Sequence, residues 1–289
     1  MSAEHSTERQ APPLEGTLPW LAGYLERLEN PGACKLDLAT LARLHEAHIT
    51  HIPFDMADGF LGQDVPFTLE HVVQKIVYER RGGGCTQMNG IFAEVLHSLG
   101  FSVQRTLAKT FQHGVCRELS THMVLLVKVE GKRWLCDVGF GLRGPIRPLS
   151  LEQCDEQVPQ VQGCHRYRVK RLINREWLVE YLRGECWQGL LVVRDADYSY
   201  EEFRVTHFYN THAPTSLFAQ HLICARPHLE GGDLLQNGTL VCVRGKRRSS
   251  YTASHLDELI DLLQAHFNIV LCAQHFQHLP PGIIKDDIR

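Results

Sequence analysis

Residues Tyr78 to Leu99 read YERRGGGCTQMNGIFAEVLHSL, in which three consecutive glycines lead to a cysteine. From Cys85 on, apolar residues recur three and four positions apart, which predicts an amphipathic helix that ends at Gly100. The amides at a helix N-terminus favour a negative sulfur, and glycines allow a close backbone approach that side chains would prevent. The stretch therefore suits either a nucleophilic cysteine or a buried thiol that follows a tight turn.

The same periodicity upstream predicts that residues 1–100 form a helical bundle. Three more helices are expected there, within residues 17–28, 37–54 and 68–81. Asp37 and Thr68 are the expected N-caps of the second and third of these helices. Residues 1–16 are polar and lack periodicity, so we expect them to be a flexible extension.

Beyond Phe101 the apolar period changes to that of strands, which predicts a small antiparallel sheet or barrel over residues 101–205. From residue 206 to residue 227 the pattern is that of irregular chain. Short strands and an amphipathic helix within residues 254–267 follow. We therefore expect an α+β protein of three parts, which span residues 1–100, 101–205 and 206–289.

The balance of charge argues against nucleic acid as a partner. A net charge of −3 and a pI near 6.6 give no basic surface for phosphates. The one basic cluster, Arg244 to Ser250, is expected to be a solvated hairpin turn, with a small anionic ligand as the alternative. No apolar run is long enough to span a membrane, and the N-terminus lacks a signal-peptide core. We expect no membrane association and a cytoplasmic location.

The ten cysteines set the background against which Cys85 is judged. None of them forms a CxxC pair, so a zinc knuckle or a thioredoxin motif is disfavoured and no metal is expected. Without a secretory signal, most should be free thiols buried as small apolar residues. By count alone, Cys85 would be one of these.

A partner for Cys85 is expected between His122 and Asp137. Free cysteine, with a pKa of about 8.5, is mostly protonated at neutral pH, so a nucleophilic cysteine needs an imidazole nearby. His122 lies near the start of one expected strand and Asp137 near the end of the next. A turn at Glu130-Gly131 would bring the two side by side, and Asp137 needs a partner among its apolar neighbours. The sequence therefore predicts a Cys–His–Asp triad, although each member alone also fits an ordinary structural role.

Four motifs resemble those of the arylamine N-acetyltransferases. RGGGC at residues 81–85, followed by Asn89, is similar to the family's cysteine signature. THM and DVGFG, which contain the histidine and the aspartate of the predicted triad, are similar to two further family segments. HIPFD at residues 51–55, and FYNTHAPTSLF with ICARP between residues 208 and 227, are also similar. The resemblance covers residues 18–227, and we expect it to continue to the end of the sequence.

The resemblance implies a helical bundle, a β-barrel and an α/β lid around a triad like that of papain or transglutaminase. It also implies ping-pong transfer, in which Cys85 takes an acetyl group from acetyl-CoA and passes it to an arylamine, arylhydrazine or arylhydroxylamine. His122 would keep the thiolate as an ion pair and handle protons, and Asp137 would orient the imidazole. Acetyl-CoA would be a co-substrate with no permanently bound cofactor, and we expect a monomer or a small homo-oligomer.

The residues that contact substrate also follow from the resemblance. Phe54 and Phe140 would stack on the aryl ring of the acceptor, with ordinary core packing as the alternative. Thr121 and Gly139 would border the CoA channel. Arg81 would support the glycine loop and not touch substrate.

Departures from the family pattern lie around the glycine loop. Gly84 stands where a bulky residue is frequent, Gln87 replaces a glutamate, and Asp55-Met56 replaces a Glu-Asn pair. Gln87 and Asp55 keep the ability to form hydrogen bonds. Gly84 is expected to loosen or widen the loop, and so to alter the range of acceptors.

Three other functions remain open at this point. An acyltransferase or amide synthase with another acyl donor would keep the triad, and so would a cysteine hydrolase. A non-catalytic binding module is the third, and the intact Cys85, His122 and Asp137 argue against it.

Overall fold

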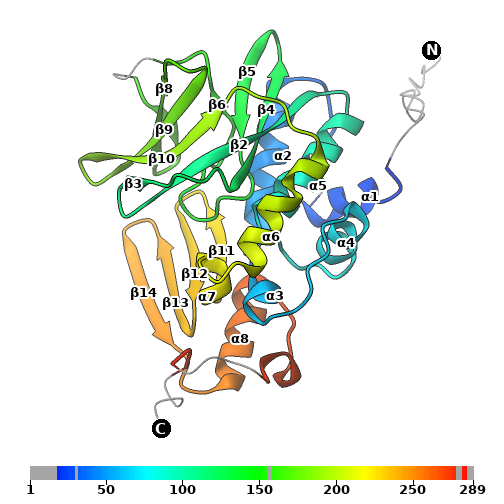
Figure 1. The fold of residues 1–289 in the computed structure, drawn as a ribbon, viewed down its shortest axis with the longest axis vertical. Coiled ribbons are helices and arrows are strands. Elements are labelled where there is room, and N and C mark those ends of the chain that lie inside the picture. Colours follow the sequence, from blue (N-terminus) through cyan, green and yellow to red (C-terminus); the bar gives the residue numbers. More distant parts are fainter. Residues whose placement is uncertain (1–17, 30–31, 155–157, 278–281, 285–289) are drawn as a thin grey trace, which may run out of the picture.

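Helices make up the N-terminal part of the chain, as the apolar periodicity predicts. The computed structural model describes residues 18–29, 32–154, 158–277 and 282–284 (Figure 1), so the expected extension lies outside the described residues. The helical elements are α1 (Leu21–Arg27), α2 (Leu38–His51), α3 (Ala57–Phe60), α4 (Leu69–Val73), the π-helical turn Gln74–Tyr78 and α5 (Cys85–Ser98). Apart from α3, their apolar faces form a single buried cluster together with one face of the central sheet. Ala57 and Phe60 of α3 belong to a second cluster near the C-terminus.

Both predicted N-caps are confirmed. Asp37 Oδ1 accepts a hydrogen bond from the amide of Thr40 at 2.7 Å, and Thr68 Oγ1 accepts one from the amide of His71 at 3.2 Å. The C-terminal end of α5 is followed by Gly100, which has a φ of +88° that few residues with a side chain adopt. These residues fix where α2 and α4 begin and where α5 ends.

The central part of the chain forms a curved antiparallel sheet, which confirms the predicted class. Its strands are β2 (Ser102–Gln112), β3 (Val115–Cys116), β4 (His122–Val129), β5 (Lys132–Cys136), β6 (Leu149–Ser150), β7 (Gln160–Gln162), β8 (His165–Arg171), β9 (Glu176–Arg183) and β10 (Cys186–Arg194). They are ordered β6-β5-β4-β2-β10-β9-β8-β7, with β3 paired to β2. The predicted turn at Glu130-Gly131 joins β4 to β5.

Two glutamine side chains bring the ends of this sheet together into a nearly closed barrel. Gln162 accepts a hydrogen bond from the Arg147 amide at 3.0 Å and donates one to the Arg147 carbonyl at 2.9 Å. Gln160 makes the same pair with Ser150, at 2.7 and 2.9 Å. The backbone pairing ends at β6 and β7, so side-chain amides join the two edges where a strand ladder does not.

A second sheet near the C-terminus includes a strand from the N-terminal part. It comprises β1 (Phe54–Asp55), β11 (Ile223–His228), β12 (Gly231–Gln236), β13 (Thr239–Arg244) and β14 (Arg247–Thr252), in that order. The expected hairpin at the basic cluster is confirmed, because β13 and β14 pair on either side of it. α8 (Leu256–Phe267) covers this sheet with its buried apolar residues, and a 3-10 turn, Ala273–Phe276, follows. Sequence analysis did not predict β1, which pairs Phe54 with Ala225.

A helix occupies residues that were expected to be irregular. The 3-10 turn Tyr200–Phe203 leads into α6 (Arg204–His212), and the short α7 (Leu217–Gln220) follows. The expectation was wrong because α6, RVTHFYNTH, is rich in residues of weak helix propensity, and buried polar contacts hold it instead. In Figure 1, α6 is drawn across the middle of the molecule. The expected boundary at residue 206 falls inside this helix.

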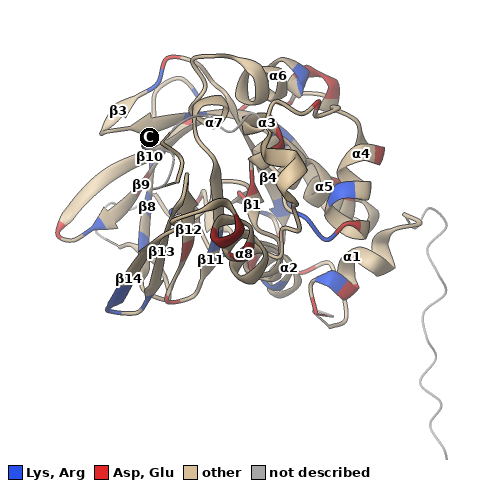
Figure 2. Ribbon diagram, turned by 90° about the horizontal axis from the view of Figure 1, so that it is seen from below, with Lys and Arg blue, Asp and Glu red and all other residues tan. Residues whose placement is uncertain are grey.

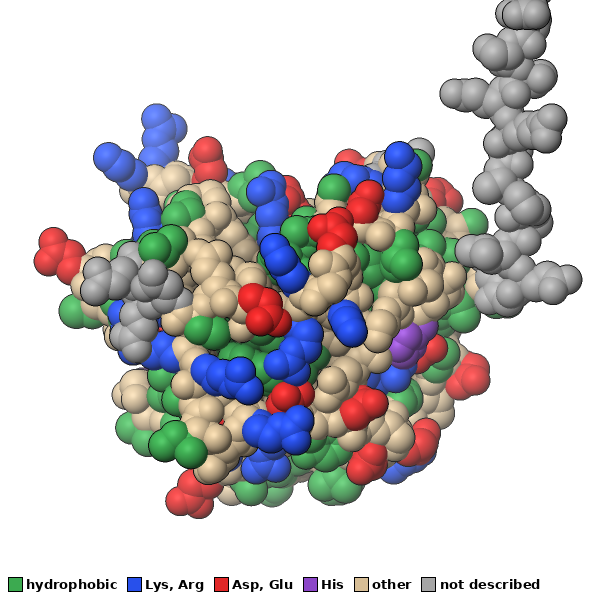
Figure 3. Space-filling view, turned by 90° about the horizontal axis from the view of Figure 1, so that it is seen from above, with side chains coloured by type: hydrophobic (Ala, Val, Ile, Leu, Met, Phe, Trp, Pro, Cys, Tyr) green, Lys and Arg blue, Asp and Glu red, His purple; other side chains and the backbone are tan. Residues whose placement is uncertain are grey.

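The surface carries both signs of charge. Lys and Arg positions are interspersed with Asp and Glu positions along the ribbon (Figure 2), and the face seen in Figure 3 also mixes them. That face therefore lacks the continuous basic surface that duplex binding requires. Within the described ranges, no helix has the length and apolarity needed to cross a membrane. All ten cysteines are unpaired thiols.

Candidate active site

Cys85 begins α5, as the glycine loop predicts. Gly84 is the N-cap residue, and its amide donates to Gln87 Oε1 at 3.2 Å. Gln87 thus closes a capping interaction, which agrees with the expectation that it keeps hydrogen-bonding ability. The Cys85 side chain is only 6% exposed and lines a cavity of about 300 Å³. The sulfur therefore lies at a helix N-terminus and borders this cavity.

His122 and Asp137 lie side by side, as the β4–β5 hairpin predicts. His122 Nε2 is 2.7 Å from Asp137 Oδ2, which leaves Nδ1 as the ring nitrogen available to Cys85. Burial alone would lower the pKa of His122, but attraction to Asp137 and Cys85 outweighs it and raises the pKa to about 10. Burial would raise the pKa of Asp137, but His122 and further hydrogen bonds hold that pKa below its ordinary value. The pair is therefore an imidazolium and a carboxylate at neutral pH.

Two buried side chains hold Asp137 in place. Asn89 donates to Asp137 Oδ1 at 3.0 Å and accepts from the Val138 amide at 3.0 Å. His45 Nε2 accepts from the Asp137 amide at 3.0 Å, and His45 Nδ1 lies 2.9 Å from the Ile146 carbonyl. Burial lowers the pKa of His45 to about 4, so this ring is neutral. Asn89 belongs to the cysteine motif, whereas sequence analysis missed His45 because nothing distinguishes it among 17 histidines.

Arg81 supports the glycine loop, as expected. Its guanidinium donates to Asp55 Oδ2 at 2.7 and 3.1 Å and to Asp58 Oδ1 at 2.6 Å. Lys75 Nζ lies 2.7 Å from the other oxygen of Asp58. Burial would raise the pKa of Asp55, but Lys75 and Arg81 outweigh it and lower the pKa to about 2. This network ties β1 and α3 to the loop that precedes Cys85.

The room that was expected beside Gly84 is filled by Met56. A Cβ atom added at Gly84 would lie 2.5 Å from Met56 Sδ, well inside van der Waals contact. Met56 is itself buried, with 6% of its surface exposed. The expectation that Gly84 loosens or widens the loop was therefore wrong. The two departures from the family pattern compensate, because Met56 takes the space that a bulkier residue at 84 would need.

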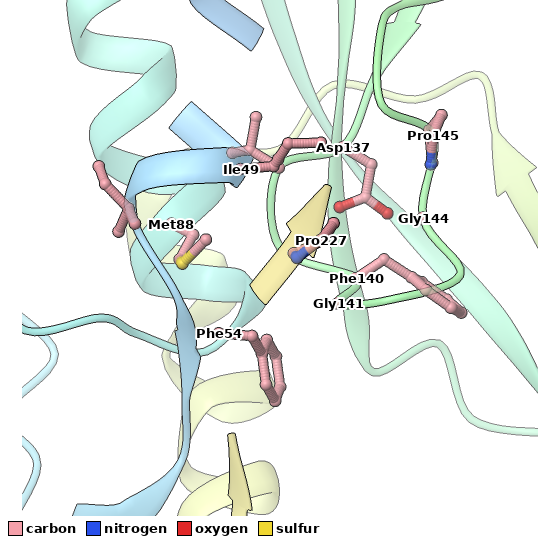
Figure 4. A pocket seen from close by; sticks show the side chains of 11 residues that line it. Ile49, Phe54, Met88, Asp137, Phe140, Gly141, Gly144, Pro145 and Pro227 are labelled. Carbon is pink, nitrogen blue, oxygen red and sulfur yellow. The ribbon is translucent and has the colours of Figure 1, made fainter. Parts of the chain in front are cut away.

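The cavity beside Cys85 includes the residues that the resemblance names. Its lining contains Phe54, Thr121, His122, Gly139 and Phe140. The ring of Phe140 meets that of His122 edge to face, with centroids 5.3 Å apart. Phe54 is buried in a small apolar cluster and also faces the cavity, so core packing and lining coexist at that residue. A second cavity, of about 10 Å³, lies between Phe54, Phe140 and Asp137 (Figure 4) and has room for about one water.

Gly139 and Thr121 pack directly against the nucleophile. A Cβ at Gly139 would lie 2.6 Å from the Cα of Cys85, so no side chain fits there. The Gly139 amide donates to Asp137 Oδ1 at 3.0 Å. The carbonyl oxygen of Thr121 is 4.0 Å from Cys85 Sγ. The backbone on both sides of the sulfur is therefore fixed by close contacts.

α6 brings two side chains to the site that sequence analysis did not predict. Asn210 Nδ2 donates to the Thr121 carbonyl at 2.9 Å and lies 3.8 Å from Cys85 Sγ. The ring of His207, one turn earlier, lies 3.0 Å from Thr86 Oγ1. Because this segment was expected to be irregular, no periodic pattern placed either side chain.

One group of possible metal ligands occurs among the described residues. Asp233, Cys242 and His266 bring ligand atoms within 4.8 Å of one another. Arg244, however, contacts both carboxylate oxygens of Asp233, at 2.7 and 2.9 Å. A fixed cation thus already neutralises the carboxylate, and the group has the character of a salt bridge between a buried aspartate and a half-exposed arginine.

A thiol at a helix N-terminus, followed by an imidazole and a carboxylate in series, defines the class of enzymes that use cysteine as a nucleophile. Comparison with known proteins narrows this class. A family model described as N-acetyltransferase matches residues 37–276, which is most of the chain. The chain belongs to the arylamine N-acetyltransferase family.

Individual relatives agree with this family. The arylamine N-acetyltransferase of Escherichia coli strain K12 is 30% identical over 220 residues, which cover 75% of this chain and 76% of that protein. The solved arylamine N-acetyltransferase of Salmonella typhimurium superposes with a TM-score of 0.83 at 26% identity, covering 90% of this chain and 97% of that one. The enzyme of Mycobacterium marinum, solved in complex with CoA, gives a TM-score of 0.79 at 27% identity, covering 86% and 92%.

Proposed function

We propose that this chain moves an acetyl group from acetyl-CoA, through a thioester on Cys85, to the nitrogen of an arylamine, arylhydrazine or arylhydroxylamine. The observation that carries the proposal is the meeting of Cys85, His122 and Asp137 beside one cavity of about 300 Å³. The names of the relatives support the acceptor class, and the CoA complex of the Mycobacterium marinum enzyme supports the donor.

The first half-reaction acylates Cys85. The Cys85 thiolate attacks the carbonyl carbon of acetyl-CoA, and a new carbon–sulfur bond forms. The bond between that carbon and the sulfur of CoA then breaks, and the departing CoA sulfur takes the proton of the His122 imidazolium. Acylation removes the negative charge of Cys85, which is one of the two attractions that raise the His122 pKa to about 10. The imidazolium therefore becomes more acidic at the moment when CoA needs a proton.

The second half-reaction restores the resting site. The acceptor nitrogen attacks the thioester carbon, and neutral His122 takes the proton that this nitrogen loses. The carbon–sulfur bond to Cys85 breaks, so the thiolate and the imidazolium form again as an ion pair. Asp137, 2.7 Å from His122 Nε2, stabilises the charged ring in both steps.

The cavity offers surfaces that suit both substrates. Phe140 and Phe54 present aromatic rings against which an aryl acceptor can stack. Thr121 and Gly139 border the approach of the acetyl thioester to the sulfur. A volume of about 300 Å³ accommodates the reacting ends of the substrates and not the whole of CoA.

Two arginines suit the charged end of the donor. Arg117 and Arg143 line the same cavity, and guanidinium groups pair well with phosphate oxygens. Arg117 Nη2 donates to Tyr209 Oη at 3.3 Å, which holds it at the wall. We infer that the phosphates of CoA lie outside the cavity, against these side chains.

Intact-mass spectrometry after incubation with acetyl-CoA tests the proposal. The wild type should gain one acetyl group and lose it when an arylamine is added, and Cys85→Ala should gain none. Cys164→Ala is the matched control, because Cys164 is exposed and is not part of the cavity lining. It should acetylate like the wild type.

Two results would contradict the proposal in different ways. If the wild type gains no acetyl group, acetyl-CoA is not the donor, and an amide synthase or a cysteine hydrolase with the same triad becomes the better reading. If Cys85→Ala is still acetylated, another residue carries the group.

We further propose that a monomer suffices, because one chain supplies the whole triad and the whole cavity lining. The ten unpaired cysteines favour a reducing compartment, and we propose the cytoplasm. The division into a bundle, a barrel and a lid at residues 100 and 205 stays part of this proposal, with β1 and α6 crossing its boundaries. Size-exclusion chromatography combined with the activity assay tests the first point.

A further inference from the structure

Asn210 stands next to the reacting sulfur without a role in the steps above. It lies in α6, is 8% exposed and faces the active-site cavity. Its Nδ2 atom is 2.9 Å from the carbonyl oxygen of Thr121 and 3.8 Å from Cys85 Sγ. A carbonyl oxygen only accepts hydrogen bonds, so the side-chain group that faces it must be the NH₂ end of the amide. One N–H group of that end can therefore donate to the Thr121 carbonyl while the other donates to Cys85 Sγ.

The surrounding contacts hold Asn210 in this position. His207, one turn earlier on α6, contacts Thr86 Oγ1 at 3.0 Å and the Val65 carbonyl at 2.8 Å. Thr86 is the residue that follows the nucleophile, so α6 is fixed to the beginning of α5. On the other side, Ser216 Oγ donates to the backbone carbonyl of Asn210 at 2.8 Å. The amide is thus positioned before any substrate arrives.

The electrostatics around the sulfur explain why a donor is useful there. The Thr121 carbonyl directs its negative end toward Cys85 Sγ from 4.0 Å, which disfavours a thiolate in a buried site. An N–H group that binds this carbonyl weakens its effect, and a second N–H group directed at the sulfur favours the anion. Both effects come from one side chain.

We propose that Asn210 is a catalytic residue of this site, and that its amide supplies the Cys85 thiolate with a hydrogen bond in addition to the His122 ion pair. The proposal deepens the function proposed above and rests on Cys85 being the nucleophile. It does not depend on which acyl group Cys85 carries.

The rate at which iodoacetamide alkylates Cys85, measured by mass spectrometry of the digested peptide that contains Cys85, tests the inference without any acyl donor. Asn210→Leu removes both N–H groups at similar volume and should slow alkylation at neutral pH by about tenfold, the effect of one hydrogen bond to a charged group. Asn210→Asp places a negative oxygen near the sulfur and should slow it by about a hundredfold.

Controls separate this role from a structural one. Val205→Ala changes an exposed residue of the same helix, 78% exposed, and should alkylate like the wild type. If Asn210→Leu does not fold, Asn210→Ser replaces it and should show a similar loss. The inference is overturned if folded Asn210→Leu, or Asn210→Ser, alkylates at the wild-type rate.

The acetylation assay keeps the two proposals apart. If the wild type alkylates normally at Cys85 but never takes up an acetyl group, the proposed acetyl transfer fails, and the alkylation rates of the Asn210 variants still decide the role of the amide. If acetylation succeeds and those rates equal the wild-type rate, only the proposed role of Asn210 is contradicted.

Discussion

Met56 and Gly84 are adjacent beside Cys85, and the Met56 side chain fills the space next to Gly84. The two departures from the family pattern therefore depend on each other. A bulky residue at position 84 and a smaller one at position 56 would fill the same volume with the sizes exchanged. The contact distance of 2.5 Å, for a Cβ added at Gly84, makes this exchange measurable.

Gly84→Val should therefore lower the free energy of unfolding by about 1–3 kcal/mol, the usual effect of overpacking a buried site. Met56→Ala in the same chain should restore part of that loss, because it opens the space that the new side chain needs. A double-mutant cycle in urea denaturation measures the coupling. Additive effects of the two changes would show that the positions do not share a space.

Asp137→Asn tests the electrostatic support of the imidazolium. The change keeps the size of the side chain but removes the charge that lies 2.7 Å from His122 Nε2 and helps to raise the His122 pKa. Single-turnover acylation by acetyl-CoA should slow by at least about a hundredfold, as expected for the loss of an effective general acid–base pair. Circular dichroism confirms that the variant is folded. An unchanged acylation rate would remove Asp137 from the triad.

Among the secondary-structure elements, the barrel depends on side chains where its backbone pairing ends. Gln162 is 6% exposed and satisfies both backbone groups of Arg147. A buried amide or carbonyl without a hydrogen-bond partner lowers stability, and this one side chain supplies the partner for both groups.

Gln162→Leu should lower the free energy of unfolding by about 2 kcal/mol, because it leaves these backbone groups without a partner. Val161→Thr is the matched control on β7, since Val161 is 59% exposed and should tolerate the change. Chemical denaturation compares the two variants. Equal stabilities would show that the glutamine amide does not hold the edges of the barrel together.

Elements with a regular pattern could be predicted from the sequence, whereas those held by distant contacts could not. α2, α5 and the β4–β5 hairpin have clear periods, so Cys85 and the His122–Asp137 pair could be placed in advance. β1 has only two residues and exists because β11 pairs with it. α6 lacks a continuous apolar stripe, so Asn210 and His207 could not be placed from periodicity. The room beside Gly84 was misjudged because it depends on a side chain 28 positions earlier, Met56.

The stability of the whole molecule should depend on pH through His122. A histidine whose pKa is raised on folding stabilises the protein fully below its unfolded value, near 6.5, and this contribution disappears as the pH rises through about 10. The advantage of the wild type over His122→Gln should therefore shrink between these two values. Urea denaturation over a pH series measures it, and a difference that does not change with pH would contradict the raised pKa.

The contribution of His45 to the free energy of unfolding changes with pH in the opposite direction. Its pKa is lowered to about 4 by burial, so its contribution is present above about 6.5 and is lost as the pH falls toward 4. The His45→Gln variant should thus approach the wild type on the acid side, where the His122 contribution is complete.

The pairing of β1 with β11 also constrains when activity can arise during protein synthesis. Phe54 leaves the ribosome early, but its partner Ala225 is made 171 residues later. The cysteine, the histidine and the aspartate are all translated before β11 and α6 are complete, so a nascent chain holds its reactive groups without the walls that shape their cavity. Newly made chains therefore gain a selective active site only after β11 and α6 have been made.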